Sequence, residues 1–299
     1  LHKAIRRQRQ MCIRDSSMTL SYDVNTGKAA PYSALTIVST AAWGLGYFGM
    51  PHILLRFMAI EDEKKLKLSR RVATIWVVIS LFVAVFIGVI GYTMSKVGAL
   101  EMLTGSNSET IIVKISALLS QHGVIFALLA GVILAGILAS TMSTSDSQLL
   151  AASSAVSSDI LGAFRKDSSN KNGSMAAARI TLLVISVVAA FIARNPDSSV
   201  FAIVSFAWAG FGAAFGPVVL FSLFWKRTNK WGALAGMVCG GSMVFIWKYL
   251  IRPLGGIWNI YELLPAFLIA CAAIVIVSLL TPKPSKEIEE EFDRVAQMK

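Results

Sequence analysis

Charged residues, cysteine and histidine are all scarce in this sequence of 299 residues. Asp, Glu, Lys and Arg make up 15% of it, against about 25% in an average soluble protein, while 55% is hydrophobic. The three cysteines form no CxxC pair and the three histidines are scattered, so no zinc-type ligand spacing occurs. A Ser/His/Asp set, a P-loop and a glycine-rich GxGxxG loop after a strand are also missing. These absences argue against an enzyme and against a soluble domain.

Basic residues are nevertheless in excess, with a net charge of +11. The first sixteen residues hold five basic residues and one acid, which accounts for +4 of this charge. The remaining excess lies in short segments between apolar runs, where the positive-inside rule places it, so it predicts a lipid bilayer as partner and no nucleic acid. We expect residues 1–17 to be a non-native leader, 18–282 a transmembrane core and 283–299 an acidic cytoplasmic tail.

Apolar segments of membrane length recur along the chain, each near the ~20 residues that cross a bilayer. They predict an all-α polytopic protein of the cell (inner) membrane. About seven spans are expected, near 32–59, 72–97, 122–159, 176–193, 200–225, 233–251 and 263–280. Basic loops then place the C-terminus in the cytoplasm, with Arg252 in an external connection as the exception. Because an odd number of spans begins outside, we expect further helices upstream.

A stripe of hydroxyl side chains runs along the third predicted span. A helix places four of them at i, i+3, i+4 and i+7 on one face: Ser140, Ser143, Thr144 and Ser147. Ser154 and Ser158 extend this face by one and two turns. Oxygen ligands suit a small hard cation such as Na⁺. Small residues also allow membrane helices to approach closely, so helix–helix contact is the alternative.

The first predicted span is interrupted in its middle by Gly44, Gly46, Gly49 and Pro51. Glycine exposes backbone, and proline removes an N–H and clashes with the preceding turn. Broken helices inside a bilayer are tolerated where they line a cavity or other protein, and in transporters they form the binding site. A simple proline kink is the alternative. The aromatic residues Trp43, Tyr47 and Phe48 beside the break favour a binding site instead.

Three longer stretches resemble the sodium:solute symporter family. They are WGLGYFGMPHILLRFMA at 43–59, STSDSQLLAASSAVSSDI at 143–160 and LFWKRTNKWGALAGMVCGG at 223–241. The likeness runs from about residue 22 to residue 283 and is strongest to members that transport proline. It implies the leucine-transporter fold, which has two inverted five-helix repeats. The first five spans then correspond to core helices six to ten, the second repeat, and the last two are peripheral.

The resemblance also implies where Na⁺ binds. In this family the ion lies between core helices one and eight, and helix eight supplies two adjacent hydroxyls and a backbone carbonyl one turn earlier. The hydroxyls match Ser143 and Thr144, and the carbonyl matches Ser140. These residues share the face of the hydroxyl stripe. Asp146 falls outside that face, so we interpret it as a contact or gating residue and not as a ligand.

Three residues on the broken helix match the solute contacts of the proline-transporting members: Trp43, Tyr47 and Pro51. Aromatic walls suit the apolar ring of proline. Those members have Gln before the proline residue, whereas this chain has Met50. This difference leaves the choice of solute open.

The resemblance therefore predicts sodium-coupled secondary active transport of a small solute, most simply L-proline, by alternating access. Na⁺ is the coupling ion, and no organic cofactor is expected. Trp208, Gly210 and Gly212 are expected to let core helix ten bend as an external gate, and helix–helix contact through the glycines is the alternative. Another amino acid, pantothenate or a sugar is the alternative solute. A membrane sensor is the alternative of another class, although the tail after Leu280 is too short for a kinase domain.

Overall fold

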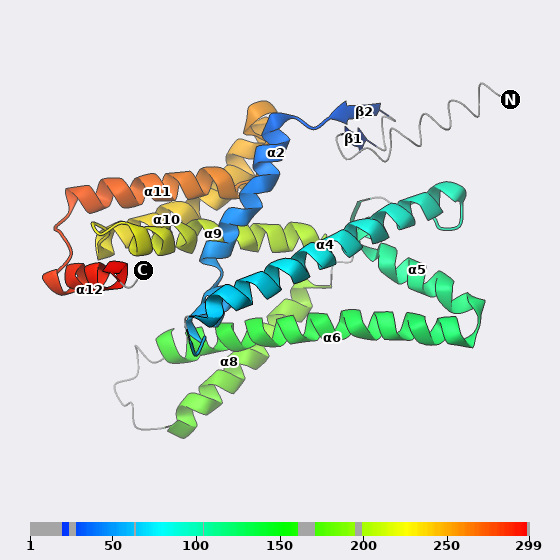
Figure 1. The fold of residues 1–299 in the computed structure, drawn as a ribbon, viewed down its shortest axis with the longest axis horizontal. Coiled ribbons are helices and arrows are strands. Elements are labelled where there is room, and N and C mark those ends of the chain that lie inside the picture. The colour runs from blue at the N-terminus through cyan, green and yellow to red at the C-terminus, as the bar shows by residue number, and fades with distance from the viewer. Residues whose placement is uncertain are drawn as a thin grey trace. The chain divides into compact units, whose positions relative to one another are not determined.

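The structure is a computed structural model, and it describes residues 20–23, 28–62, 64–103, 105–160, 171–194 and 199–297. The expected leader at 1–17 lies outside these residues. Helices make up nearly all of the described chain (Figure 1). The departure from an all-helical fold is a small antiparallel hairpin, in which β1 (Leu20–Asp23) pairs with β2 (Lys28–Pro31) and Leu20 lies opposite Pro31.

Six helices in the described ranges are long and apolar enough to cross a membrane. They are α4 (Lys65–Val97), α6 (Val124–Ser154), α8 (Lys171–Ile192), α9 (Val200–Phe224), α10 (Lys230–Ile246) and α11 (Leu263–Leu280). These helices correspond to predicted spans two to seven.

The first predicted span is not one continuous helix. It consists of α2 (Ala34–Ala41), the 3-10 helix η1 (Ala42–Gly49) and α3 (Pro51–Met58). Met50 between η1 and α3 is extended, with φ −82° and ψ 114°. A proline ring pushes the residue before it out of the helical region, so Met50 is extended. Proline itself is favoured at the first position of a helix, so α3 begins at Pro51. The predicted interruption is confirmed, and the described ranges contain six continuous long helices where seven spans were expected.

The second long helix begins earlier than its predicted start at residue 72. Residues 60–71 were expected to form a charged loop, but α4 already begins at Lys65. Asp62 explains the difference, because its Oδ1 accepts the N–H of Lys64 at 2.9 Å and its carbonyl accepts the N–H of Lys65 at 3.0 Å. Lys, Leu and Arg are also good helix formers. The prediction of a loop as far as residue 71 is therefore wrong.

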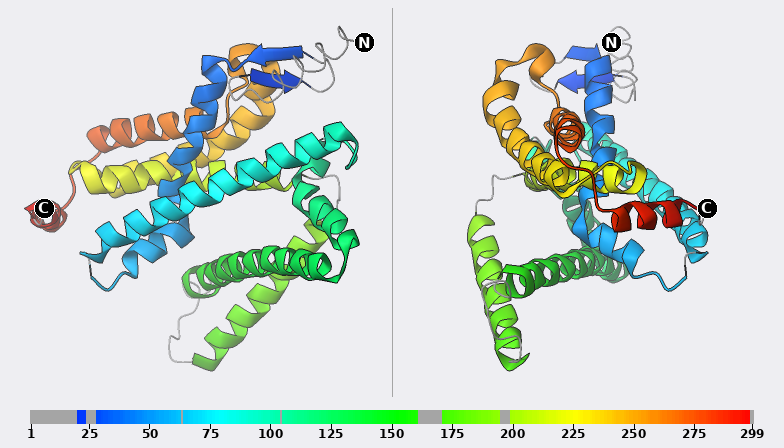
Figure 2. Two further views of the ribbon diagram at one scale, coloured as in Figure 1. Left: turned by 45° about the vertical axis from the view of Figure 1, so that its right-hand side comes forward. Right: turned by 90° about the vertical axis from the view of Figure 1, so that its left-hand side faces the viewer.

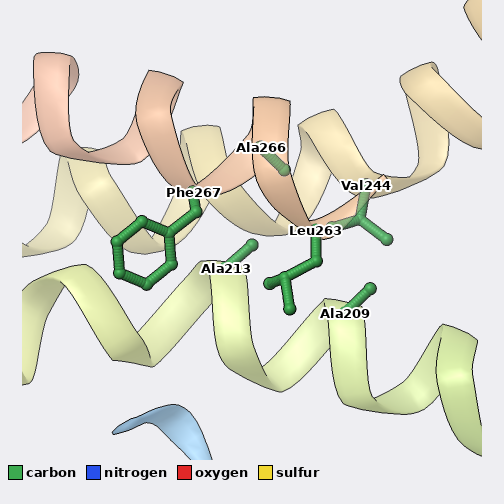
Figure 3. Close-up of a cluster of buried hydrophobic side chains, with 6 residues drawn as sticks. All are labelled: Ala209, Ala213, Val244, Leu263, Ala266 and Phe267. Atoms are coloured by element: carbon green, nitrogen blue, oxygen red, sulfur yellow. The ribbon is translucent and has the colours of Figure 1, made fainter. Parts of the chain in front are cut away.

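The chain divides into two compact units, which we describe separately. The first contains residues 1–54 and 204–299. Within it, the apolar part of α9 lies beside α10 and α11 in all three ribbon views (Figures 1 and 2). Leu263 and Phe267 of α11 reach toward Ala209 and Ala213 of α9 (Figure 3). Small residues on α9 thus leave room for large ones on α11, which fits the way that membrane helices associate.

A short acidic helix, α12 (Lys286–Gln297), ends the described chain in this first unit. Its Asp293 forms an ion pair with Lys226 at 2.6 Å, in the connection between α9 and α10. Both side chains are open to solvent, so the pair stabilises the fold only slightly. The ion pair places α12 beside the connection between α9 and α10.

The second unit contains residues 55–203, including α4, α6, α8 and a shorter helix, α5 (Ile111–Leu119). Gly91 of α4 allows close approach of Ile111 of α5. Ser153 of α6 is 2% exposed, and its hydroxyl donates to the carbonyl oxygen of Ala178 in α8 at 2.7 Å. These contacts hold the neighbouring helices of the unit together.

Candidate functional site

In the first unit, two residues of η1 contact aromatic side chains from distant parts of the chain. The ring centroids of Trp43 and Trp208 lie 5.6 Å apart with an interplanar angle of 16°. Tyr261 stacks on Trp43 at 5.7 Å and 15°, while Tyr47 meets Trp208 edge-on at 4.8 Å and 84°. We call Trp43, Tyr47, Trp208 and Tyr261 the aromatic cluster. It brings together two predicted solute residues and one predicted gate residue.

Hydrogen bonds fix the orientation of this cluster. The indole Nε1–H of Trp208 donates to the carbonyl oxygen of Trp43 at 3.0 Å. The hydroxyl of Tyr261 donates to the carbonyl oxygen of Ser205 at 2.6 Å, and its backbone N–H donates to Oγ of Ser39 at 2.7 Å. Burial and the adjacent Glu262 carboxylate raise the pKa of Tyr261 above its usual range, so its hydroxyl remains a donor.

The cluster forms because η1 approaches α9 closely at glycine positions. A Cβ atom added to Gly46 would collide with the indole ring of Trp208. One added to Gly212 would lie 2.7 Å from the Cα of Gly46. In contrast, Gly210 has no atom within 4 Å of the equivalent position. Gly212, expected as a gate residue, is therefore a contact point between α9 and η1 in this structure.

Pro51, the third predicted solute residue, is the first residue of α3 and is exposed. The preceding Met50 is 5% exposed, and its carbonyl oxygen accepts the N–H groups of Ile53 and Leu54, both at 3.0 Å. The carbonyl of Met50 is therefore engaged with the start of α3, and its side chain is buried. Sequence reasoning marked this position because Met stands where an amide was expected.

An apolar groove of about 280 Å³ lies between α9 and α10 in the same unit. Its wall includes Gly210 and three phenylalanines of α9 and one of α10: Phe206, Phe211, Phe215 and Phe245. The groove has no polar lining, so it offers no group to orient a charged amino acid. We therefore do not assign it to the solute.

In the second unit, the hydroxyl stripe lies on α6, which is helical throughout that region. Thr144 Oγ1 donates to the carbonyl oxygen of Ser140 at 3.1 Å, and Ser147 Oγ donates to that of Ser143 at 3.0 Å. All four residues are exposed. Two predicted ligand atoms, the Ser140 carbonyl oxygen and the Thr144 hydroxyl oxygen, are therefore adjacent.

The winding of the backbone changes at the end of the hydroxyl stripe. Ser154 is the last residue of α6, and the chain then winds as a π-helix, η4 (Ala155–Ile160). A π-helix is wider than an α-helix, so the 3.6-residue period that placed Ser158 on the same face no longer applies. The side chain of Ser158 lies outside the described residues. Asp146 is exposed on α6.

The stripe offers neutral hydroxyl and carbonyl oxygens, which are the type of ligand that hard cations take. Thr144 must turn its proton away from the Ser140 carbonyl before both oxygens can face one ion. No group of three or more His, Cys, Asp or Glu residues that would hold a metal occurs in the part of the chain that the structure describes.

The connection between α10 and α11 contains residues that sequence reasoning missed. Glu262 is 1% exposed and pairs with the guanidinium of Arg252 at 2.9 Å. Nε of Arg252 also donates to Oδ1 of Asn259 at 3.1 Å. This pair accounts for the one basic residue that departed from the charge rule, because Arg252 neutralises a buried acid. In the sequence, the only sign of a role for the adjacent Tyr261 is its place beside an acidic residue at the start of a predicted span.

Glu109 caps the start of α9 in the second unit. The Ser199 hydroxyl donates to its Oε1, and the N–H of Val200 donates to its Oε2 at 3.1 Å. These hydrogen bonds, chiefly that from Ser199, lower the pKa of Glu109 below its usual value. A carboxylate is favoured at this position because the N-terminus of a helix carries partial positive charge.

Comparison with known proteins identifies a single family. A profile described as the sodium:solute symporter family matches residues 6–240. The chain is 41% identical over 262 residues to the sodium/proline symporter of Haemophilus influenzae, covering 87% of this chain and 51% of that protein. It is 39% identical over 259 residues to the sodium/proline symporter of Escherichia coli, covering 86% and 50%.

A third similar protein is the osmoregulated proline transporter OpuE of Bacillus subtilis, 39% identical over 254 residues, covering 85% of this chain and 50% of that protein. The chain thus spans about half the length of the curated relatives that it matches. No solved structure matches it.

Proposed function

The chain belongs to the sodium:solute symporter family, and from this premise we propose that it forms the solute- and sodium-binding second half of a sodium-coupled transporter of L-proline. It is a multi-pass membrane protein whose relatives are transporters and not enzymes. Sodium coupling follows from the family. Proline as the solute rests on the similarity to two sodium/proline symporters and to a proline transporter.

The observation that carries the proposal is the oxygen pair on α6. The Ser140 carbonyl oxygen and Thr144 Oγ1 lie 3.1 Å apart, and the neighbouring Ser143 hydroxyl belongs to the same face. Oxygen ligands lie about 2.3–2.6 Å from a cation of the size of Ca²⁺, and Na⁺ is similar in size, so one ion can contact both atoms. We propose Ser140, Ser143 and Thr144 as the sodium ligands that this chain contributes.

For the solute, the aromatic cluster supports Trp43 and Tyr47 as walls of the pocket and Pro51 as the residue that restarts the broken helix. Tyr47 is 52% exposed, so more than half of its surface is open to a ligand. A compact apolar ring such as that of proline gains from contact with aromatic surface. Trp208, Gly210 and Gly212 of α9 are proposed as the external gate above this pocket.

The architecture that we propose is the second five-helix repeat of the leucine-transporter fold, followed by two peripheral helices. α2–η1–α3 is then core helix six, and α4, α6, α8 and α9 are core helices seven to ten. The C-terminus lies in the cytoplasm in this arrangement. Binding of Na⁺ to α6 raises the affinity for the solute, and by reciprocity the solute raises the affinity for Na⁺.

Another solute of similar size is the second candidate, because Met50 is buried at 5% exposure where proline-transporting members have Gln. Replacing an amide by a thioether removes two donors and an acceptor from this part of the pocket wall.

Both candidates are tested by a hybrid in which residues 20–297 replace the matching half of the E. coli symporter. Uptake of labelled proline, another amino acid, pantothenate and a sugar is measured with and without Na⁺. Sodium-dependent proline uptake supports the proposal. If the hybrid takes up only another solute with Na⁺, proline is not the substrate. If uptake is equal with and without Na⁺, transport is not coupled to sodium.

A further inference from the structure

Trp43 stacks with two other aromatic rings. The ring centroid of Trp208 lies 5.6 Å from that of Trp43, and the centroid of Tyr261 lies 5.7 Å from it, with both pairs within 16° of parallel. Trp43 is half-buried, so only part of its surface is left for a ligand. The orientation of that part depends on how firmly the two neighbouring rings are held.

Trp208 is held by the helix that carries it, since it lies in the middle of α9. Tyr261 has no such support, because it precedes the first residue of α11. Instead, it is fixed by contacts at three points. Its hydroxyl donates to Ser205 on α9, its backbone N–H donates to Ser39 on α2, and its ring lies on Trp43.

The next residue in the chain, Glu262, is held as well. Its carboxylate is buried and paired with Arg252 at 2.9 Å. An unpaired carboxylate would be costly at this depth, so the pair favours one conformation of the connection between α10 and α11. The connection thus presents Tyr261 to the broken segment in a defined position.

We infer that Tyr261 is a positioning residue for the solute pocket: it holds Trp43 against Trp208 and so sets the orientation in which Trp43 meets the solute. This role rests on the proposed function, and it assigns part of the pocket to a connection outside the proposed five-helix repeat. Tyr261 itself does not contact the solute in this account.

The test compares two substitutions in the hybrid transporter. Tyr261→Phe keeps the stacked ring and removes the hydroxyl, whereas Tyr261→Leu keeps similar volume and removes the ring. Loss of one aromatic pair predicts that Tyr261→Leu raises KM for the solute about three- to tenfold, with Vmax per inserted protein within about twofold. For Tyr261→Phe, KM is expected to stay within about twofold of the value for the unsubstituted hybrid. Tyr249→Leu is the matched control, because Tyr249 is 63% exposed and its ring contacts Phe206 instead of Trp43.

A second measurement needs no transport. Two stacked indoles give an exciton couplet in circular dichroism, and the chain in lipid nanodiscs is expected to show one from Trp43 and Trp208. The couplet weakens in Tyr261→Leu and persists in Tyr261→Phe and Tyr249→Leu. Trp247 and Trp258, whose ring centroids lie 5.8 Å apart, give a couplet of their own, so the contribution of Trp43 and Trp208 is taken as the part of the spectrum that Trp43→Phe removes.

An unchanged KM and couplet in Tyr261→Leu would overturn the inference, and so would an equal loss in Tyr261→Phe, since the ring would then not be responsible. A hybrid without sodium-dependent uptake of any solute in the panel overturns the proposed function instead. In that case, the couplet still decides whether Tyr261 holds Trp43.

Discussion

The indole N–H of Trp208 donates to the backbone carbonyl of Trp43 at 3.0 Å while the two rings stack at 5.6 Å. One residue on α9 thus satisfies the backbone and covers the side chain of a residue 165 positions earlier. The contact explains how a broken segment can remain ordered in a membrane protein. A carbonyl near the break has a partner, and the gap between helices is filled by aromatic surface.

Close approach of η1 to α9 predicts opposite effects of alanine at two neighbouring glycines. Gly46→Ala forces a Cβ into the Trp208 ring, and overpacking of this kind destabilises by about 1–3 kcal/mol. Gly44→Ala meets no atom within 4 Å and leaves stability unchanged or slightly higher. Thermal unfolding of the purified chain in detergent measures both. Equal unfolding temperatures for the two variants would contradict the contact.

Truncation of the pocket walls should weaken solute binding. Trp43→Ala and Tyr47→Ala each remove a ring from the aromatic cluster, and loss of an aromatic contact of about 0.5–1.5 kcal/mol corresponds to about two- to twelvefold in affinity. Trp231→Ala is the control, because Trp231 lies on α10 and contacts Lys230 instead of the cluster. Calorimetric titration of the hybrid with proline provides the measurement. Undiminished affinity in both cluster variants would remove these residues from the pocket.

The Arg252–Glu262 pair predicts an asymmetry between its two partners. Arg252→Ala leaves the Glu262 carboxylate, with a side chain 2% exposed, without a cation and should destabilise by about 3 kcal/mol. Glu262→Gln leaves Arg252, whose side chain is 42% exposed and can be hydrated, so about 1 kcal/mol is expected. Denaturation of the chain in detergent distinguishes the two. Glu291→Gln, in an exposed pair, is the control, and a reversed order would contradict the burial of Glu262.

The cap at the start of α9 predicts a pH dependence. Hydrogen bonds lower the pKa of Glu109 from 4.5 in the folded chain, so its stabilising effect is present above that value and is lost as the pH falls through the lowered pKa. Glu109→Gln should therefore unfold at a lower temperature than the unsubstituted chain at pH 7. The difference narrows as the pH is taken below 4.5. Glu101→Gln in the same region is the control. A difference that grows on acidification would contradict the cap.

Much of the helical arrangement follows from local patterns in the sequence. Apolar runs of membrane length predicted the six long helices, and Gly44 to Pro51 predicted the break in the first span. The ends were less certain because hydropathy does not report them. Asp62 accepts the N–H of Lys64 just before α4, within a charged segment that was expected to lie outside the helix. The π-helical winding from Ala155 leaves no mark in the hydrophobic periodicity of the sequence.

The candidate site divides in the same way. Helical spacing placed Ser140, Ser143 and Thr144 on one face without any knowledge of tertiary contacts. The cluster of Trp43 with Trp208 and Tyr261 joins segments more than 160 residues apart, and no local pattern encodes which aromatic residues meet. From the sequence, Trp43 was expected in the solute pocket and Trp208 in the gate, with no contact predicted between them. Their contact, and the part played by Tyr261, came only from the structure.

The sodium ligands on α6 are the central claim, and the Na⁺ concentration for half-maximal solute uptake by the hybrid tests them most directly. Ser143→Ala and Thr144→Ala should each raise this concentration about tenfold or more, because each removes an oxygen that contacts a charge. Thr141→Ala loses an equivalent hydrogen bond, from its Oγ1 to the Ile137 carbonyl at 2.9 Å, but lies off the stripe and should stay within about twofold. A Na⁺ requirement that is unchanged in Ser143→Ala and Thr144→Ala, or that rises equally in Thr141→Ala, would contradict the account.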